Sequence, residues 1–191
     1  FDQYHVLAET LISEGYIQIG LDHFARDDDT LAKALATGQL KRNFQGYTTD
    51  DCNTLIAMGP SGISAFKEGY AQNAKDIRAY SEMVDKGELA LNRGVARTAD
   101  DHLRSALIER VMCDLFVDVS EVCRRLGRNE ADLADIWPRL REAEKRGLCD
   151  VNGSKVIIPF AARIFVRTVA QCFDAYLGDG AMPERRHAKA V

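Results

Sequence analysis

The first 21 residues combine a helical and a strand pattern of hydrophobic positions. Residues 2–14 place apolar side chains at the one-sided spacing of an amphipathic helix, and Gly15 offers a stop. Residues 16–21 are rich in strand formers and predict a short strand. A helix followed directly by a strand is typical of one unit of a parallel α/β sheet or barrel, in which strand ends face the active site. Asp22 and His23 fall at that end.

Turn and cap signals divide the following residues. Asp28 or Asp29 is a helix cap, and Gly38 closes the helix that it begins. A polar loop comes next. The remaining elements that we expect in the first half are a strand at 54–58, a helix at 74–86 and an extended run at 91–97.

A new module is expected to begin at Thr98, which forms a capping-box pattern with Asp101. Helices are predicted through Cys113, over residues 120–126 and over 130–146, the last one broken near Pro138. Asn152-Gly153 then joins two short apolar strands, a strong hairpin signal. The predicted closing helix spans residues 160–177 and turns these side chains inward: Ile164, Val169, Phe173, Tyr176 and Leu177.

Together these patterns predict an α+β protein. Residues 1–97 are expected to form a partial α/β barrel unit and a closing segment. Residues 98–177 have the order of a winged-helix-like domain, and residues 178–191 are expected to be a disordered tail. No internal repeat is visible.

The composition limits the classes of protein to which the chain can belong. The chain has 191 residues, of which 46% are hydrophobic and 28% charged, as in ordinary globular proteins. Residues 1–97 hold 10 Lys and Arg against 14 Asp and Glu, and residues 98–191 hold 15 of each. Neither half has the basic excess typical of nucleic-acid binding. No apolar run approaches the roughly 20 residues of a membrane span, and no secretory signal is present.

Five cysteines lie 61, 10, 26 and 23 residues apart, without the clustered spacing of a zinc or iron–sulfur site. We therefore expect no metal site within this chain. The odd number predicts reduced thiols in a cytoplasmic protein. Cys113, Cys123 and Cys172 sit among apolar residues on predicted helices and are expected in the core. The chain starts at Phe1, inside a predicted helix, so it is expected to be a piece of a longer protein.

Two motifs carry the candidate chemistry: Gly20-Leu21-Asp22-His23-Phe24-Ala25-Arg26 and Asn43-Phe44-Gln45-Gly46-Tyr47-Thr48-Thr49. Both set aromatic, amide and charged side chains beside glycines, outside regular elements. Such loop positions commonly hold binding chemistry. For either motif alone, a polar turn with one anchoring aromatic is an equally good interpretation.

These motifs, with Gly62-Ile63-Ser64, Tyr70-Ala71-Gln72-Asn73 and Phe173-Asp174-Ala175-Tyr176-Leu177, resemble the oxygen-independent coproporphyrinogen III oxidases. Those are radical S-adenosylmethionine (SAM) enzymes of haem biosynthesis. The resemblance covers nearly the whole chain. The related haem-chaperone branch differs where this chain reads Asp22-His23-Phe24-Ala25, which favours the oxidase itself.

The resemblance implies that this chain is the carboxy-terminal part of such an enzyme. The family's larger amino-terminal radical-SAM barrel carries a CxxxCxxC-type motif for a 4Fe–4S cluster, and that motif is absent here. In the family a 5′-deoxyadenosyl radical takes a hydrogen from a propionate. Loss of carbon dioxide then leaves a vinyl group, so that two such steps turn coproporphyrinogen III into protoporphyrinogen IX. The isolated chain is therefore expected to be inactive, and the electron donor stays unknown.

The resemblance also implies a second SAM near Phe44, Gln45 and Ile63. An amide can both donate to and accept from an amino-acid or adenine edge, and apolar neighbours exclude water from a radical. Pro60 and Gly62 depart from the usual family residues, Val and Ala, and Pro60 fixes its own φ in the loop that leads to Ile63.

A substrate with four carboxylates needs cations, and the nearest to the motifs are Lys41, Arg42 and Lys75. Surface Lys and Arg side chains are usually solvated, and that interpretation stays open for each of the three. His23 and Asp22 are candidates for a proton relay, or for a hydrogen-bonded pair that ties down the following loop. Tyr47 is expected to pack, with its hydroxyl bonded to a neighbour.

The alternative function is a winged-helix DNA-binding or protein-interaction module. Cations of the predicted third helix suit phosphates, but Glu142 and Glu144 interrupt them and the domain's net charge is zero. The favoured interpretation has no nucleic-acid or membrane partner.

Overall fold

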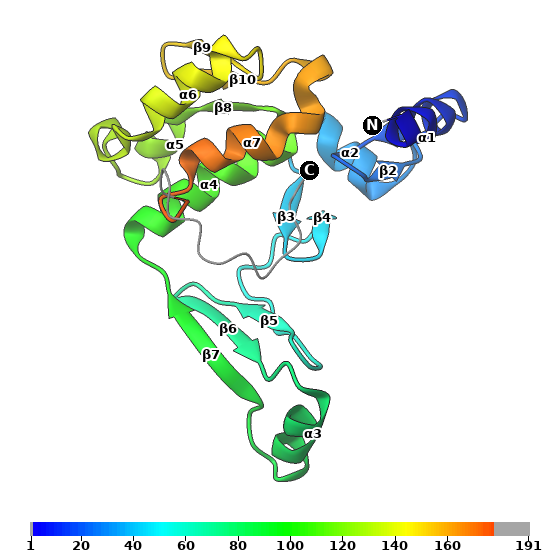
Figure 1. Ribbon diagram of the computed structural model, residues 1–191, viewed down its shortest axis with the longest axis vertical. Coiled ribbons are helices and arrows are strands. Elements are labelled where there is room, and N and C mark those ends of the chain that lie inside the picture. The colour runs from blue at the N-terminus through cyan, green and yellow to red at the C-terminus, as the bar shows by residue number, and fades with distance from the viewer. Residues whose placement is uncertain (1, 178–191) are drawn as a thin grey trace.

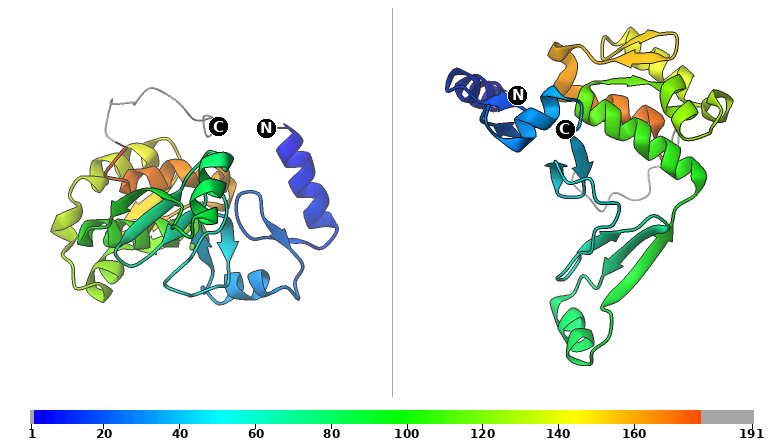
Figure 2. Two further views of the ribbon diagram at one scale, coloured as in Figure 1. Left: turned by 90° about the horizontal axis from the view of Figure 1, so that it is seen from below. Right: turned by 180° about the vertical axis from the view of Figure 1, so that it is seen from behind.

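The computed structural model describes residues 2–177; the predicted disordered tail, residues 178–191, lies outside the described residues. Figure 1 shows a helical part, a small hairpin beside it and a projecting lobe of three strands and a helix, and Figure 2 shows the same separation from behind. The elements in chain order are α1 (Asp2–Ser13), β1 (Ile17–Gln18), β2 (Phe24–Ala25), α2 (Thr30–Ala36), β3 (Lys41–Asn43), β4 (Gly46–Thr48), β5 (Ile63–Ala65), β6 (Gly69–Asn73), α3 (Ile77–Asp85), β7 (Leu91–Ala96), α4 (Ala99–Asp114), β8 (Phe116–Asp118), α5 (Val119–Arg125), η1 (Glu130–Leu133), α6 (Ile136–Lys145), β9 (Asp150–Asn152), β10 (Lys155–Ile157), η2 (Phe160–Phe165), α7 (Val166–Ala170) and η3 (Gln171–Phe173).

The first strand differs from its prediction. It shrinks to two residues, and it pairs antiparallel with β2 after the chain turns back through Gly20 and Asp22. Every strand pair within residues 2–177 is antiparallel, and these residues form no closed barrel. The mixed helix and strand content is as predicted, whereas the parallel unit is not present in this part of the chain.

The projecting lobe is the sheet β5-β6-β7 with α3 at its far end. The strand predicted at 54–58 is absent: only Leu55 forms an isolated bridge, to Ala65. Side chains replace the ladder there, because the backbone N–H of Ala57 donates to Ser64 Oγ and its carbonyl accepts from Asn73. Helix α3 begins at its cap Asp76, later than predicted.

The helical part begins at Thr98, as the capping-box pattern predicts. Thr98 and Asp101 form a capping box at α4. The break predicted at Pro138 falls earlier, between η1 and α6, so Trp137 is helical and Pro138 lies in the first turn of α6. Proline is tolerated there because first-turn N–H groups have no helical partner.

The hairpin β9–β10 forms around the turn after Asn152, where Gly153 has φ +59°. With β8 it makes a sheet of order β8-β10-β9. The prediction of a single closing helix over residues 160–177 is wrong, because the segment divides into η2, α7 and η3. Tyr176 and Leu177, which the sequence predicts to point inward, are exposed. Tyr176 instead donates its hydroxyl to Asp101.

The main core lies in the helical part, where it includes Leu107, Leu140, Val156 and Phe173, all fully buried. Each such side chain contributes about 1.5–3 kcal/mol through burial. The predicted core cysteines Cys113, Cys123 and Cys172 are buried. A second, smaller cluster centres on Leu40 and Tyr47. The domain boundary near residue 97 stays a prediction. Within residues 2–177 no helix has both the length and the apolar character that crossing a membrane requires.

Candidate functional site

The two predicted motifs interlock through their glycines. A Cβ built on Gly20 would lie 1.9 Å from Tyr47 Cε2, and one on Gly46 would lie 2.6 Å from His23 Nε2. Each motif therefore supplies the glycine that the other motif's ring needs. His23 and Tyr47 also meet edge to face, with ring centroids 5.1 Å apart. This mutual packing explains why the two runs carry glycines at these positions.

Asp22 and His23 form a local pair. His23 Nδ1 lies 2.7 Å from Asp22 Oδ1. Partial burial acts to raise the pKa of Asp22, but the hydrogen bond and charge of His23, with a backbone hydrogen bond and the charge of Arg167, together leave that pKa below its ordinary value. The carboxylate thus stays ionised beside the imidazole. The contact agrees with the orienting role, and a proton relay remains a prediction.

Tyr47 is a packing residue. It is 7% exposed, and its hydroxyl donates to the carbonyl oxygen of Met112 at 3.1 Å, which confirms the expected bonded hydroxyl. Burial raises its pKa. The guanidinium of Arg42 lies 4.7 Å from the ring centroid. Tyr47 therefore joins the hairpin β3–β4 to α4 and fixes Arg42 above it.

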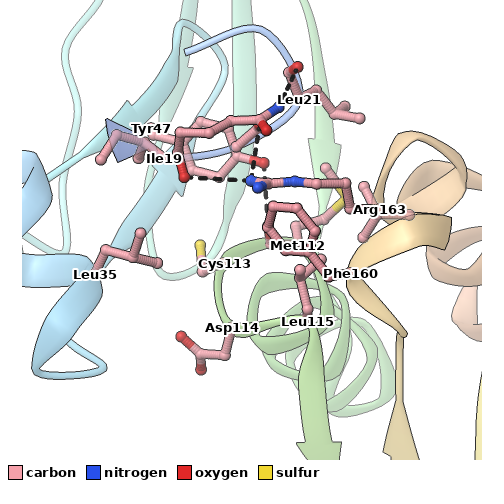
Figure 3. A pocket seen from close by; sticks show the side chains of 13 residues that line it. Ile19, Leu21, Leu35, Tyr47, Met112, Cys113, Asp114, Leu115, Phe160 and Arg163 are labelled. Carbon is pink, nitrogen blue, oxygen red and sulfur yellow. Dashed lines mark hydrogen bonds between the residues drawn. The ribbon is translucent and has the colours of Figure 1, made fainter. Parts of the chain in front are cut away.

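Arg163 joins the helical part to the first motif. Its guanidinium donates to the carbonyls of Gln18 and Gly20 at 3.3 and 3.2 Å and lies 4.7 Å from the ring centroid of Phe160. Figure 3 shows it beside a cavity of about 210 Å³. Burial lowers the pKa of Arg163. The residue is a structural tie that the sequence alone did not indicate.

A larger groove of about 880 Å³ lies between the hairpin β3–β4, the projecting lobe and α4. Three predicted site residues, Lys41, Arg42 and Phe44, line it. The other predicted site residues do not line this groove: Asp22, His23, Gln45, Ile63 and Lys75. Lys41 Nζ lies 3.9 Å from Glu109 Oε2, a loose ion pair.

Phe44 and Gln45 form the two-residue turn of the hairpin, between Asn43 and Gly46. Phe44 is 54% exposed and meets Tyr70 of β6 edge to face at 5.2 Å. The side-chain amide of Gln45 has no hydrogen-bond partner among the described residues, and its backbone N–H donates to Asn43. The turn thus presents an exposed aromatic ring and an amide that can both donate and accept, and the SAM-binding role of the two residues stays a prediction.

Ile63 is less well supported as part of the same site. It lies in β5, paired with Gln72, and it is half-buried. The preceding loop is held by Ser61, whose N–H donates to Ala74 and whose φ is +61°. Ile63 does not line the groove that Phe44 lines. Its cofactor role remains a prediction.

Arg97 is the groove residue that the sequence analysis missed. Its guanidinium lies 5.2 Å from the ring centroid of Tyr70, and its backbone N–H donates to Glu68. Its Nε atom is buried without a hydrogen-bond partner in the described part of the chain. An unsatisfied buried donor costs about 1–3 kcal/mol. In the sequence, Arg97 only ends an extended run, and nothing there indicated that it lines a groove.

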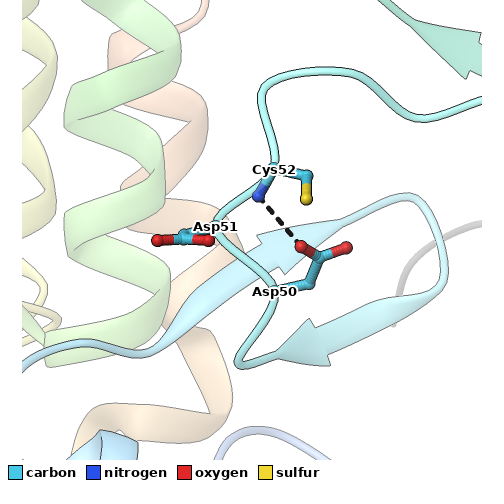
Figure 4. A group of neighbouring side chains, drawn as sticks. All are labelled: Asp50, Asp51 and Cys52. Atoms are coloured by element: carbon cyan, nitrogen blue, oxygen red, sulfur yellow. Dashed lines mark hydrogen bonds between the residues drawn. The ribbon is translucent and has the colours of Figure 1, made fainter.

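Asp50, Asp51 and Cys52 bring three metal-ligand atoms within 4.8 Å of one another, all exposed (Figure 4). Their grouping follows from a local turn, because Asp50 Oδ1 accepts the N–H of Cys52 at 2.9 Å. They are the one such group within residues 2–177, and they do not include the several cysteines that an iron–sulfur cluster needs.

Comparison with solved structures defines the class. The chain is similar to coproporphyrinogen III oxidase from Escherichia coli, described as a radical SAM enzyme, with a TM-score of 0.82 and 40% identity. The match covers 90% of this chain and 41% of the other. Comparison with protein-family models gives no match.

Curated relatives specify the type of enzyme. An oxygen-independent coproporphyrinogen III oxidase of Bradyrhizobium diazoefficiens is 39% identical over 190 residues, which cover 100% of this chain and 42% of that protein. The Escherichia coli relative is 40% identical over 176 residues, covering 90% of this chain and 38% of the relative. The chain thus spans about two fifths of the length of these relatives. It is homologous to the carboxy-terminal part of oxygen-independent coproporphyrinogen III oxidases, as its motifs predicted.

Proposed function

We propose that this chain is the carboxy-terminal part of a cytoplasmic oxygen-independent coproporphyrinogen III oxidase. The observation that carries the proposal is homology along the whole chain, together with the interlocked motifs, of which the second lines a groove of about 880 Å³. In the complete enzyme the substrate would be coproporphyrinogen III and the product protoporphyrinogen IX.

The chain's own part is to bind and to exclude water. Phe44 offers an apolar face and Gln45 a free amide to a SAM molecule, and Lys41 and Arg42 offer charge to the propionates. SAM reduced by a 4Fe–4S cluster supplies hydrogen-abstracting chemistry when bound. The cluster ligands would come from an upstream barrel, so residues 1–191 alone are expected to be inactive.

The test uses a chimera in which residues 1–191 replace the carboxy-terminal part of the Escherichia coli relative. Gln45→Ala and Ile63→Asp are expected to abolish turnover while the cluster content, read from its visible absorption, stays unchanged. Gln39→Ala, at an exposed site outside the motifs, is the matched control and should keep full activity. Normal turnover in both site variants would remove the cofactor assignment.

A second candidate is supported by the order of elements. Helices α4, α5 and α6 with the sheet β8-β10-β9 follow the order of a winged helix, a class that binds DNA or protein. However, the cations of α6 are engaged within the chain: Arg139 donates to Asp174 O, Arg141 to Glu144 and Val151, and Lys145 pairs with Glu142. We favour a role in packing on the upstream barrel. Tight, salt-sensitive binding in a gel-shift titration with random duplex DNA would support the alternative.

A further inference from the structure

We infer that Arg97 is a carboxylate-binding residue of the groove, the one that holds an acidic side chain of an aromatic polycarboxylate ligand against Tyr70. The inference deepens the proposed function and rests on it only for the identity of that ligand. Nothing in the two motifs includes Arg97, which lies between β7 and α4.

The first support is a hydrogen-bond donor of Arg97 that has no acceptor among the described residues. Arg97 Nε is buried and has no hydrogen-bond partner in residues 2–177. A guanidinium fork binds a carboxylate through two parallel hydrogen bonds, and a side-on pair uses Nε as one donor. Because Nε has almost no exposed surface in this conformation, a ligand carboxylate beside Tyr70 would supply the missing acceptor after a rotation of the Arg97 side chain.

The second support is the lack of an internal counter-charge. No carboxylate of the described residues lies within ion-pair distance, 4.0 Å, of Arg97. The nearby acid, Asp101, is occupied: one oxygen accepts from the N–H and hydroxyl of Thr98, and the other accepts from Tyr176. The charge of Arg97 helps to lower the pKa of Asp101, after the larger effect of the Thr98 hydrogen bonds. The guanidinium of Arg97 therefore contacts the Tyr70 ring but has no carboxylate partner among the described residues.

The third support is the composition of the groove around Arg97. Aromatic surface from Phe44, Phe66 and Tyr70 lies beside the cations Lys41, Arg42 and Arg97. Of the groove's acids, Glu109 is engaged with Lys41 and with the backbone N–H of Arg42, and Asp50 with Cys52. The third acid, Asp51, is exposed and bonds none of the three cations. Aromatic faces beside Arg97, which has no carboxylate partner among the described residues, suit a ring compound that carries several carboxylates.

The position of Arg97 is fixed from both sides. Its backbone N–H donates to Glu68 at 2.8 Å, and its guanidinium lies over the Tyr70 ring. Tyr70 in turn touches Phe44 at the tip of the β3–β4 hairpin. A row of Phe44, Tyr70 and Arg97 thus links the hairpin that carries the motif to the lobe. Ligand bound at Arg97 would lie beside Phe44.

The test measures binding to this chain directly, with two probes. One is coproporphyrin III, the stable oxidised form of the proposed substrate. The other is benzene tricarboxylate, with its uncharged trimethanol analogue as the control ligand. The readout is the arginine Nε–H signal in NMR that disappears in Arg97→Lys, together with the dissociation constant.

Carboxylate probes are expected to shift that signal, whereas the trimethanol analogue leaves it in place. Arg97→Gln should weaken binding about tenfold or more, the loss expected for a charged hydrogen-bonded pair. Arg97→Lys, which keeps the charge but loses the fork, should weaken it less. Arg93→Gln is the matched control: Arg93 is an exposed arginine of β7 that bonds Gln72 outside the groove, and its loss should leave affinity within about twofold.

The outcomes separate the two proposals. If the tricarboxylate binds through Arg97 and coproporphyrin III does not bind, the carboxylate site stands and the porphyrin substrate falls. If neither probe moves the Arg97 signal, or if binding is unchanged in an Arg97→Gln variant whose melting curve shows a folded chain, the inference is overturned.

Discussion

Gly20→Ala is expected to break the contact between the two motifs. Its new Cβ would lie 1.9 Å from Tyr47 Cε2 and 2.1 Å from Cζ, far inside van der Waals contact. Moving the ring aside has a cost, because Tyr47 is 7% exposed and a shift toward the adjoining cavity would break the bond from its hydroxyl to Met112 O. The substitution therefore has to displace a buried aromatic ring.

The magnitude follows from two contributions. Overpacking of a closely packed site costs about 1–3 kcal/mol. Loss of the Tyr47 hydroxyl hydrogen bond adds about 1 kcal/mol. Gly20 does not have a left-handed φ, so backbone strain adds nothing. We expect a loss of about 2–4 kcal/mol in the free energy of unfolding.

The assay is urea unfolding followed by far-ultraviolet circular dichroism, in a double-mutant cycle with Tyr47→Ala. Once the ring is removed, Gly20→Ala should cost little, so the two changes should couple by about 2 kcal/mol or more. Gly87→Ala is the control: Gly87 has φ +73° and open space around it, so only strain of about 1–2 kcal/mol is expected. Additive effects of Gly20→Ala and Tyr47→Ala would refute the interlock.

Three further predictions concern the helical part, the thiols and the tyrosine. Arg104→Leu should lower the free energy of unfolding by about 2 kcal/mol, because it removes the ion pair of Arg104 with Asp135. The loss is smaller than for a fully buried pair because Asp135 is 42% exposed. Hydrogen bonding to Arg104 lowers the pKa of Asp135, so this part of the stability is present above about pH 4 and is lost as pH falls through the folded-state pKa. The gap between the urea midpoints of wild type and variant should narrow as the pH is lowered, although the bond from Arg104 to the Phe173 carbonyl does not titrate. A gap that stays constant with pH would contradict the pairing. Iodoacetamide should label the exposed Cys52 of the native protein before the buried Cys113, as followed by mass spectrometry, because burial raises the pKa of the Cys113 thiol to about 12. Labelling of Cys113 at an equal rate would count against its burial. Tyr47→Phe should lower the unfolding free energy by about 1 kcal/mol, and an unchanged urea midpoint would argue against its buried hydrogen bond.

Local chemistry made part of the fold predictable. Asp29 and Thr98 cap helices as their side chains indicated, and Gly153 turns the predicted hairpin. These features depend on residues only a few positions apart. The strand at 54–58 failed because distant groups, Ser64 and Asn73, take the backbone bonds that a ladder would use.

The sequence indicated the two motifs of the candidate site, but it did not indicate which other residues line the groove. Phe44, Lys41 and Arg42 were found because they adjoin a recognisable run. Arg97 and Arg163 act through partners that are distant in sequence, Tyr70 in one case and Gly20 in the other. An isolated arginine looks the same in sequence whether it is solvated or placed in a groove.

The most direct measurement of the proposed function is the anaerobic conversion of coproporphyrinogen III to protoporphyrinogen IX, followed by chromatography. We expect the isolated 191 residues to give no product and the chimera with the Escherichia coli upstream part to give product at a rate within about tenfold of the parent enzyme, or about 1.4 kcal/mol in barrier. A chimera with a full complement of iron and sulfide but no product, or turnover by the isolated chain, would contradict the assignment.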